Sequence, residues 1–316
     1  MNITAQFSKD VIEGLEQEPK RLFSKYFYDQ KGDRLFQEIM KMEDYYLTKS
    51  EFEIFSQQKH KILEAIRPNG KFQLIELGAG DGMKTKVLLE YFIQEKVDFE
   101  YIPIDISESV LNELEKDLKS KFPELKVKPL AMTYIDALSE LPSDEQKVVL
   151  FLGSNIGNFP YDAAANFLTQ VSKRLNVGDQ LLLGVDLKKH PQIILNAYND
   201  RHGITKAFNL NLLNRINKEF DGNFELSDFE HFPIYDPVSG ETKSYLISLK
   251  NQEVELKKLN KTFKFKYAEP IFMEISKKFS LEELEKLAND STFKVIENFL
   301  DCKQYFVDSL WQKEIK

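Results

Sequence analysis

Short apolar runs alternate with helix-like segments over residues 72–187. The segments "KTKVLLEYFIQE" and "SESVLNELEKDLKSKF" have helical spacing, and each follows an apolar run. The runs that read as strands are "FQLIEL" (72–77), "FEYIPIDI" (99–106), "VKPLAMTYI" (127–135), "KVVLFLGS" (147–154) and "DQLLLGVDL" (179–187). Strands that alternate with helices indicate an α/β fold with a doubly wound parallel sheet. Pro103 conflicts with its strand because proline lacks a backbone N–H donor.

The periodicity changes after Leu187. Residues 190–278 are mixed in pattern, with the turn "DPVSGE" between two strand-like runs. Regularity returns at Ser280, where "SLEELEKLA" opens with a capping-box pattern and "FKVIENFLD" and "YFVDSLW" predict a closing hairpin. We therefore expect two domains. One contains the sheet, residues 56–189 plus 279–316, and the other is a second α+β lobe, residues 1–55 plus 190–278.

Composition and charge exclude several classes of partner. The 316 residues carry a net charge of −8, which argues against a nucleic-acid partner. No apolar run approaches the length of a membrane span. The one cysteine, Cys302, forms no internal disulfide and suggests a reducing compartment, and the four histidines show no metal-ligand spacing. We expect a cytoplasmic protein without a metal, and with no nucleic-acid or membrane partner.

The stretch "LIELGAGDGMKTKVLL" is a glycine-rich turn between a strand and a helix, which is typical of nucleotide binding. A dinucleotide fold would place its third glycine at the position of Met83. Glu76 would repel a pyrophosphate, but it would attract the amino group and sulfonium of S-adenosylmethionine. The E-x-G-x-G-x-G pattern of Glu76, Gly78, Gly80 and Gly82 resembles the first motif of class I methyltransferases.

Two charged residues support S-adenosylmethionine as the cofactor. Asp105 ends the second strand and suits a carboxylate that holds both ribose hydroxyls, although it equally suits a helix cap before Ser107. Lys84 lies at the start of the next helix, where it either meets the methionine carboxylate or is solvated. A purely structural glycine turn is the alternative for the motif as a whole.

Other stretches resemble one particular family. They are "YFYDQKGDRLFQEIMKMEDYYLTKSE" (26–51), "FLGSNIGNF" (151–159), "NAYND" (196–200), "GITKAFNLNLLNRIN" and "MEISKKF" (273–279). In this order they resemble the histidine-specific Nα-methyltransferases of ergothioneine biosynthesis. The resemblance implies a class I methyltransferase domain with a separate substrate-binding lobe. It also implies transfer of three methyl groups to the α-amino nitrogen of L-histidine, which gives hercynine.

The resemblance assigns residues to the cofactor and to the amino-acid end of the substrate. Tyr28 matches a tyrosine beside the cofactor, and Tyr45 matches one at the substrate carboxylate. Asn158 and Tyr198 match the residues that complete the grip on the amino acid. We assign Tyr45, Asn158 and Tyr198 the catalytic task of holding the amino acid in attack geometry.

The resemblance also assigns the side-chain and adenine pockets. Glu274 and Ser276 in "MEIS" match the pair that hydrogen-bonds the imidazole, and strand alternation places both on one face. The adenine position falls at Thr133 and Tyr134, where the family often has an acid before the aromatic residue. The missing acid leaves Asp136 or a backbone carbonyl as the acceptor for the adenine amino group.

Three alternative functions remain at this point. The nearest is a methyltransferase for another amino acid or small amine, because the same residues would hold any α-amino acid. The second is an NAD(P)-dependent oxidoreductase, which Met83 and Glu76 disfavour. The third is a noncatalytic binding module on the same fold. We expect a monomer that binds a small amino-acid substrate.

Overall fold

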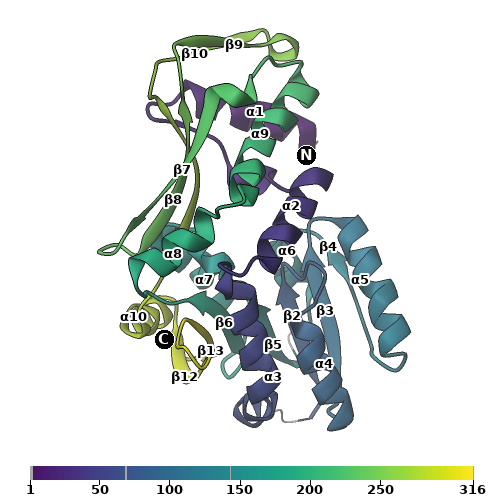
Figure 1. The fold of residues 1–316 in the computed structure, drawn as a ribbon. Coiled ribbons are helices and arrows are strands. Elements are labelled where there is room, and N and C mark those ends of the chain that lie inside the picture. The colour runs from purple at the N-terminus through teal and green to yellow at the C-terminus, as the bar shows by residue number, and fades with distance from the viewer. Residues whose placement is uncertain (1–2, 68–69, 143, 316) are drawn as a thin grey trace. The chain divides into compact units, whose positions relative to one another are not determined.

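A computed structural model describes residues 3–67, 70–142 and 144–315. The chain divides into two compact units, each made of two segments. Unit 1 comprises residues 1–46 and 189–276, and unit 2 comprises residues 47–188 and 277–316. Figure 1 gives the labels of the elements, which are used below.

Unit 2 contains a seven-stranded sheet in the order β12-β13-β6-β5-β2-β3-β4. The strands β2 to β6 run parallel, and the β12–β13 hairpin is antiparallel to them. The strands are β2 (Phe72–Leu77), β3 (Phe99–Asp105), β4 (Leu130–Ala131), β5 (Gln146–Phe151), β6 (Gln180–Asp186), β12 (Phe293–Leu300) and β13 (Phe306–Lys313). This arrangement confirms the predicted sheet and the closing hairpin.

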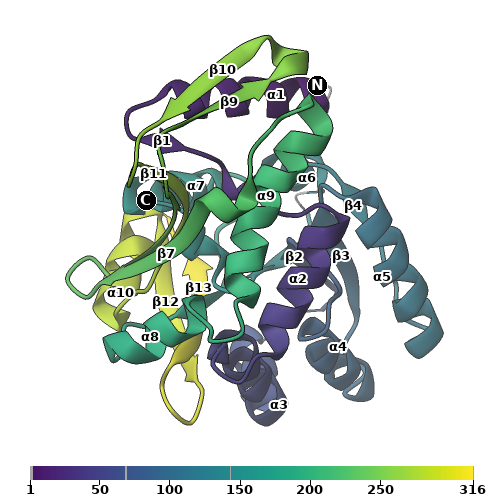
Figure 2. The ribbon, with the colours of Figure 1, turned by 45° about the horizontal axis from the view of Figure 1, so that its top comes forward.

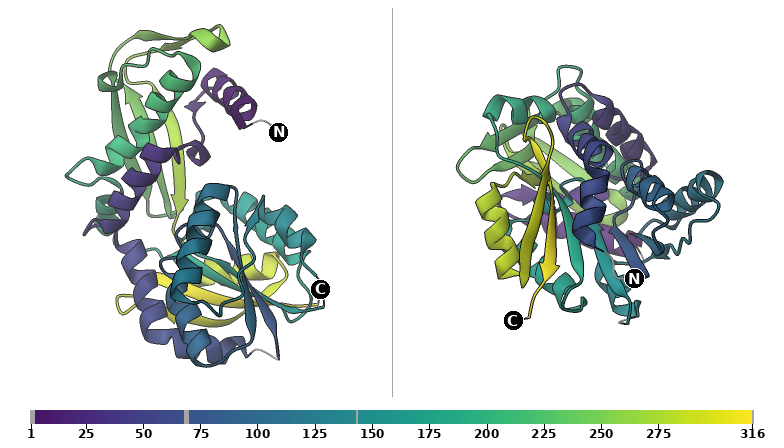
Figure 3. Two further views of the ribbon diagram at one scale, coloured as in Figure 1. Left: turned by 90° about the vertical axis from the view of Figure 1, so that its right-hand side faces the viewer. Right: turned by 90° about the horizontal axis from the view of Figure 1, so that it is seen from below.

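Helices cover both faces of the unit 2 sheet (Figure 3). They are α3 (Tyr46–Ile66), α4 (Thr85–Gln94), α5 (Glu108–Lys121), α6 (Tyr134–Glu140), α7 (Tyr161–Ser172) and α10 (Leu281–Asp290). Apolar residues of α6, α7 and α10 form one core with strand residues such as Ile75 and Val149. On the other face Phe92 of α4 packs against Phe72 and Phe99. Both faces of the central strands are thus buried, as a parallel sheet requires.

The prediction of a third strand over residues 127–135 is mostly wrong. The observed strand is short, and this explains how the sheet tolerates Pro103. Only Leu130 and Ala131 of the expected strand 127–135 form β4, because Thr133 caps helix α6 and so ends the extended backbone. Tyr101 pairs with the segment beside β4 through its N–H, which donates to the Lys126 carbonyl over 2.9 Å. Pro103 lies two residues further on, so its missing donor falls where pairing toward β4 is interrupted.

Unit 1 contains a four-stranded sheet in the order β1-β11-β8-β7 and a two-stranded ribbon, β10-β9. Figure 2 shows this ribbon beside α1. The strands are β1 (Lys20–Arg21), β7 (Phe229–Asp236), β8 (Glu241–Ser248), β9 (Gln252–Leu256), β10 (Lys261–Phe265) and β11 (Pro270–Lys277). The helices are α1 (Ile3–Glu16), α2 (Gln30–Lys41), α8 (Pro191–Tyr198) and α9 (Ile204–Phe220). Phe7, Phe208, Phe229 and Met273 belong to its core.

The boundary between the units differs from the expected one at residue 55. The structure places it after Tyr46, because α3 continues without a break and its residues from Leu47 on belong to unit 2. Near the second boundary, after residue 276, Ser280 accepts from the Glu283 N–H and Glu283 accepts from the Ser280 N–H, which confirms the capping box that starts α10.

Within the described residues, none of the helices has the length and apolar character needed to cross a bilayer.

Candidate functional site

The glycine turn of unit 2 has left-handed backbone at each of its three glycines. Their φ angles are 76° at Gly78, 53° at Gly80 and 61° at Gly82, a region that side-chain-bearing residues rarely adopt. A Cβ atom at Gly78 would lie 2.7 Å from the Tyr134 hydroxyl oxygen, whereas nothing lies within 4 Å of the corresponding point at Gly80. The turn therefore exposes backbone that a ligand can approach closely, at the carboxyl end of β2.

Glu76 is a buried acid on β2, just before this turn. Its carboxylate accepts from the Thr85 hydroxyl over 2.7 Å and from the hydroxyl of the buried Tyr101. Burial raises the pKa of Glu76 to about 7, although the two hydroxyl donors and Lys84 favour the charged form. A cationic ligand group beside Glu76 would favour ionisation further, which suits the predicted contact with an amino group.

We expect Glu76→Gln to change how stability depends on pH. In the folded protein the raised pKa keeps a proton on Glu76 that the unfolded chain loses above its ordinary pKa of 4.5. Folding stability from this group therefore falls as pH rises from about 4.5 to 7, by roughly 3 kcal/mol for the full change. The stability of Glu76→Gln relative to wild type should rise over this window in urea titrations.

The exposed Glu90 on α4 offers the control for this experiment. Glu90→Gln should show no such pH trend relative to wild type. A flat difference between Glu76→Gln and wild type from pH 5 to pH 8 would show that Glu76 is already ionised in the folded protein.

Asp105 and Tyr134 lie beside the same turn. One Asp105 carboxylate oxygen accepts from the Ser107 N–H over 3.0 Å, whereas the residue that caps α5 is Ser107, so the other Asp105 oxygen can serve a ligand. Burial raises the pKa of Tyr134 to about 12, and Asp105 and then Glu76 add to the effect. Thr133 caps α6, and its hydroxyl donates to Asp136 over 2.6 Å. Thr133 and Asp136 are both exposed, and Tyr134 is the one of the three that lines the Gly78 turn.

Lys84 is not a solvated lysine. It lies just before α4, and its ammonium forms an ion pair with Glu51 of α3. Burial opposes the charged form, but the charge and hydrogen bond of Glu51 outweigh it and raise the pKa of Lys84. The Asn155 amide nitrogen lies 3.8 Å from the points where Gly78 and Gly153 would carry Cβ atoms. Sequence reasoning missed Glu51 and Asn155 because neither belongs to the glycine motif.

Unit 1 contains four of the five residues predicted to bind the substrate, namely Tyr45, Tyr198, Glu274 and Ser276. The Tyr198 hydroxyl at the end of α8 donates to the Ser276 hydroxyl of β11 over 2.8 Å, and both residues are buried. Glu274 precedes Ser276 by two positions on the same strand, and their placement on one face stays a prediction. Tyr28 and Tyr45 are linked through Phe36, whose ring centroid lies 5.6 Å from that of Tyr28 and 6.5 Å from that of Tyr45.

Tyr28 is electrostatically coupled to this group. Loss of hydration raises its pKa well above the usual value, and the charge of Glu274 and then the hydroxyls of Tyr45 and Tyr198 add to the shift. The residue keeps 45% of its surface accessible, so a ligand can reach it, and the raised pKa keeps its hydroxyl neutral. Tyr28 was predicted to lie beside the cofactor. The structure places it among the predicted substrate residues of unit 1, and a cofactor contact stays a prediction.

Asn158 is the predicted substrate residue that belongs to unit 2. It ends a short 3-10 helix, Asn155–Asn158, that follows β5, and its side chain is exposed. Ser154 precedes this helix with a left-handed backbone, φ 58°, and its hydroxyl accepts from the Asp186 N–H over 3.0 Å. These contacts hold the segment at the carboxyl end of the sheet, where α/β proteins bind ligands.

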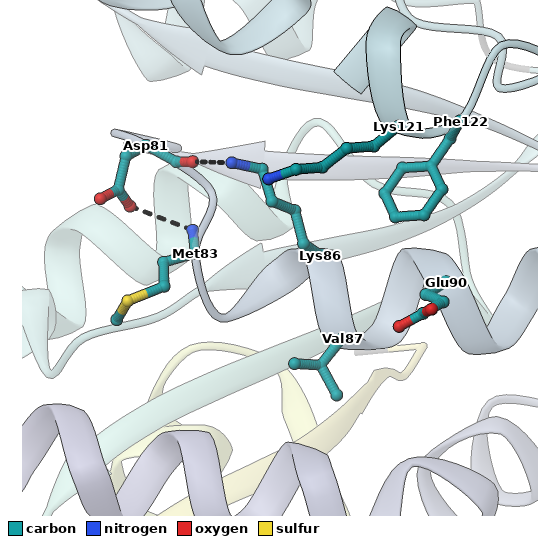
Figure 4. Close-up of a pocket in the computed structure, with 7 residues that line it drawn as sticks. All are labelled: Asp81, Met83, Lys86, Val87, Glu90, Lys121 and Phe122. Atoms are coloured by element: carbon teal, nitrogen blue, oxygen red, sulfur yellow. Dashed lines mark hydrogen bonds between the residues drawn. The ribbon is translucent and has the colours of Figure 1, made fainter. Parts of the chain in front are cut away.

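A surface pocket of about 570 Å³ lies along α4 and the end of α5 (Figure 4). Its lining residues are Asp81, Met83, Lys86, Val87, Glu90, Lys121 and Phe122. Both of its lysines are paired with Asp117, over 2.7 Å from Lys86 and 3.0 Å from Lys121. The pocket shares no residue with the predicted cofactor site, and its cations are already neutralised, so we do not assign it a ligand.

One group in the described part of the chain has ligand atoms close enough to hold a metal. It comprises Glu53, Asp301 and Cys302. The Cys302 N–H already donates to Glu53 over 2.9 Å, and Asp301 accepts from the Tyr305 and Phe306 N–H groups over 2.7 Å. The group contains no histidine and is occupied by these hydrogen bonds, so it supports no metal site.

The unit 2 residues fit S-adenosylmethionine. The open backbone at Gly80 gives a ligand close access, Asp105 offers a carboxylate to hydroxyls, and the buried Glu76 suits a cation. Lys84 supplies a positive charge at the same turn. A doubly wound parallel sheet with this donor set after its first strand defines a class I methyltransferase.

Comparison with known proteins identifies the family. Residues 7–313 match the family described as histidine-specific methyltransferase, SAM-dependent. The chain is 32% identical over 271 residues to a histidine N-alpha-methyltransferase of Mycobacterium tuberculosis, covering 86% of this chain and 84% of that protein. It is 33% identical to ergothioneine biosynthesis protein 1 of Schizosaccharomyces pombe, over 91% of this chain and 38% of that protein. The chain belongs to the histidine-specific, S-adenosylmethionine-dependent methyltransferases.

A more distant relative has another substrate in its name. The 4-dimethylallyltryptophan N-methyltransferase of Claviceps purpurea is 30% identical over 201 residues, which cover 60% of this chain and 58% of that protein. Similarity at this level therefore extends to proteins named for a different amino-acid derivative. The substrate has to be argued from the residues of this chain.

Proposed function

We propose that this enzyme methylates the α-amino nitrogen of L-histidine three times, which gives the betaine hercynine. The observation that carries the proposal is the unit 1 group, in which Glu274 and the Tyr198–Ser276 hydrogen bond accompany Tyr28 and Tyr45. An imidazole N–H needs an acceptor, and the Glu274 carboxylate supplies it. The Ser276 hydroxyl both donates and accepts, so it suits the other ring nitrogen.

The amino-acid end of the substrate needs different partners. Its carboxylate accepts hydrogen bonds only, and we assign Tyr45 as a donor to it. Asn158 and Tyr198 hold the amino group, since an amide oxygen and a phenol oxygen both accept from N–H. Tyr28 supplies a second neutral phenol in this group, because its raised pKa keeps it protonated. These assignments use each residue in the protonation state that its surroundings favour.

The task of these residues is to position a neutral amine. S-adenosylmethionine, when bound, supplies an electrophilic methyl group on a sulfonium centre. A peptide α-amino group has a pKa of roughly 8, that of a free amino acid is higher because its own carboxylate stabilises the ammonium, and each unit above ambient pH costs about 1.4 kcal/mol. Fixed, in-line geometry contributes on the order of 7–11 kcal/mol. Positioning therefore outweighs deprotonation, and no strong base is required. The proton released from the amine passes to water, directly or relayed through a tyrosine hydroxyl, while Asn158 accepts a hydrogen bond from the amine without taking the proton.

We assign the cofactor to the unit 2 residues. Asp105 would hold the ribose hydroxyls, Lys84 the methionine carboxylate and Glu76 the methionine amino group. Gly78 and Gly80 leave room for the approach, and the Tyr134 ring would pack against the adenine. Thr133 would contact the adenine only through its backbone, because its hydroxyl is bonded to Asp136.

A different amino acid as the natural substrate is the main alternative, because Tyr45, Asn158 and Tyr198 would hold any α-amino acid. Titration calorimetry against a panel of amino acids, with S-adenosylhomocysteine present, separates the two. We expect histidine to bind at least roughly tenfold more tightly than phenylalanine or tryptophan, because only histidine pairs with the Glu274 carboxylate. Equal affinities, or a preference for tryptophan, would contradict the histidine assignment.

The sequence further suggests a cytoplasmic monomer. A single chain supplies every residue assigned above, so the proposed reaction requires no partner subunit. Light scattering at assay concentration, measured with and without histidine, tests the monomer prediction.

A further inference from the structure

Two buried carboxyl groups lie next to Lys84, and the reaction as described does not use them. Glu51 of α3 and Asp308 of β13 both have 0% of their surface exposed. One Glu51 oxygen accepts from the Lys84 ammonium, and the other accepts from the Gly153 N–H over 2.7 Å. Glu51 thus connects Lys84 to the backbone at the carboxyl end of β5.

The two carboxyl groups meet above Gly184 of β6. A Cβ atom at Gly184 would lie 2.2 Å from a Glu51 oxygen and 3.0 Å from an Asp308 oxygen. Gly184 pairs directly with Asp308 in the sheet register. A glycine is needed here because the carboxyl oxygens occupy the space that any side chain would take.

Asp308 lies close to Glu51 and, in the described part of the chain, receives no hydrogen bond from a donor group elsewhere. Among the described residues no N–H or O–H group donates to either buried Asp308 oxygen, and its neighbour Glu51 is an acceptor when ionised. Two adjacent buried acceptors repel each other unless one is protonated and donates to the other. Burial, followed by the Glu51 charge, raises the pKa of Asp308 well above its usual range, and Lys84 only partly opposes this.

The shared proton sets the charge of the cluster. With Asp308 protonated, one negative charge on Glu51 balances the positive charge on Lys84. If both carboxyl groups were ionised, the cluster would carry a net negative charge and would repel an anionic ligand group. The protonated state therefore leaves Lys84 able to attract a second carboxylate.

We propose that Glu51 is a positioning residue of the methyl-donor site. Glu51 shares a proton with Asp308, and in this state it keeps Lys84 charged and oriented toward the methionine carboxylate. The proposal rests on the proposed function, because it takes Lys84 as the residue that binds that carboxylate. Glu51 itself does not touch the cofactor. Its effect passes entirely through the ammonium of Lys84.

The test is S-adenosylhomocysteine affinity as a function of pH in Glu51→Gln. The acids that face Lys84 are Glu51, Asp308 and Glu76, and in wild type the Glu51 charge outweighs burial and keeps the pKa of Lys84 raised. Burial, the larger cause of the raised Asp308 pKa, keeps Asp308 neutral in this variant, so no second acid replaces the lost charge. Burial then dominates at Lys84, which loses its proton at lower pH. The ratio of the Glu51→Gln Kd to the wild-type Kd should grow about tenfold or more between pH 7 and pH 9.5, since each pH unit above the pKa costs about tenfold in charged lysine.

Matched variants separate a positioning role from a structural one. Lys84→Met should weaken S-adenosylhomocysteine binding. The ratio of its Kd to the wild-type Kd would fall with rising pH only if Lys84 lost its proton in wild type. We expect this ratio to be independent of pH. Glu64 is an exposed residue of α3, the helix that carries Glu51, so Glu64→Gln should have the wild-type Kd at every pH. Asp308→Asn keeps a neutral hydrogen-bond donor toward Glu51, so its Kd should stay within roughly threefold of wild type, well below the change of a lost charge-assisted bond.

The outcomes distinguish this inference from the proposed function. If Lys84→Met binds S-adenosylhomocysteine like wild type, the assignment of Lys84 to the methionine carboxylate is wrong. If Lys84→Met is weak but the Glu51→Gln ratio is independent of pH, Lys84 binds the cofactor and the role of Glu51 is overturned. Should Glu51→Gln fail to fold, infrared spectra at neutral pH decide. Glu76, with its pKa of about 7, contributes a protonated-carboxyl band to both proteins, so a band that is stronger in wild type than in Asp308→Asn supports the shared proton, and identical spectra refute it.

Discussion

Replacing Glu274 by alanine should raise the histidine KM by roughly 10- to 150-fold, while the Kd of S-adenosylhomocysteine stays within about threefold of wild type. The range corresponds to loss of one charge-assisted hydrogen bond, about 1.5–3 kcal/mol. Glu274 is only partly buried on β11, which argues against the larger penalty of a fully desolvated ion pair. Steady-state kinetics with varied histidine, combined with calorimetry for the cofactor, measures both effects.

The exposed Glu230 on β7 of the same sheet supplies the matched control. Glu230→Ala should leave both constants unchanged. Glu274→Ala should also narrow the preference for histidine over phenylalanine, because the charge that disfavours an apolar ring is gone. An unchanged histidine KM in Glu274→Ala would remove the basis for the imidazole assignment, and an equal loss of cofactor affinity would point to damage of the fold.

Replacing Asp105 by alanine should weaken S-adenosylhomocysteine binding by roughly 150-fold or more, the effect of two charge-assisted hydrogen bonds at about 1.5 kcal/mol each. The carboxylate would accept from two ribose hydroxyls, and the variant loses both charge-assisted bonds. Asp105 is partly exposed at the end of β3, so the melting temperature should change little. Calorimetry gives the affinity, and a thermal melt gives the stability.

Two further variants separate the proposed ribose contact of Asp105 from its hydrogen bond with the Ser107 N–H. Asp105→Asn keeps an oxygen for the Ser107 N–H but loses the negative charge, so it should bind weakly and melt like wild type. Asp98→Ala, at the exposed residue just before the same strand, should bind like wild type. Wild-type affinity in Asp105→Ala, or tight NAD binding by the unmodified protein, would contradict the cofactor site.

Sequence periodicity predicts those elements whose conformation follows from the burial of their own apolar residues. The strand Phe72–Leu77 has the predicted bounds, because a continuous apolar run followed by glycines leaves no other buried conformation. The expected strand 127–135 shrank to Leu130–Ala131, because the Thr133 hydroxyl caps a helix and local capping competes with extension. The domain boundary was placed at 55 and lies at 46, because an unbroken helix has no local signal for a change of domain.

The candidate site divides in the same way. Glu76 and Gly78 became candidates because each has a fixed position in a short motif, and Asp105 because it ends the second predicted strand; their contacts with the cofactor stay predictions. Tyr198 and Ser276 are 78 positions apart in the chain, so their hydrogen bond is visible only in the folded unit. Their assignment from sequence relied on resemblance and not on spacing. Glu51 ends the stretch 26–51 and Asp308 lies in the predicted hairpin, but neither received a role from sequence, because a buried acid has no signature until its neighbours are known.

The measurement that tests the central claim most directly is mass spectrometry of the purified protein with S-adenosylmethionine and one amino acid at a time. Histidine should gain one, two and then three methyl groups on its α-nitrogen, and the other amino acids should stay essentially unmodified. The trimethylated product should not form with Glu274→Ala at wild-type rates. If histidine stays unmodified while another amino acid or amine is methylated, the fold and the cofactor site remain, and the histidine assignment is wrong.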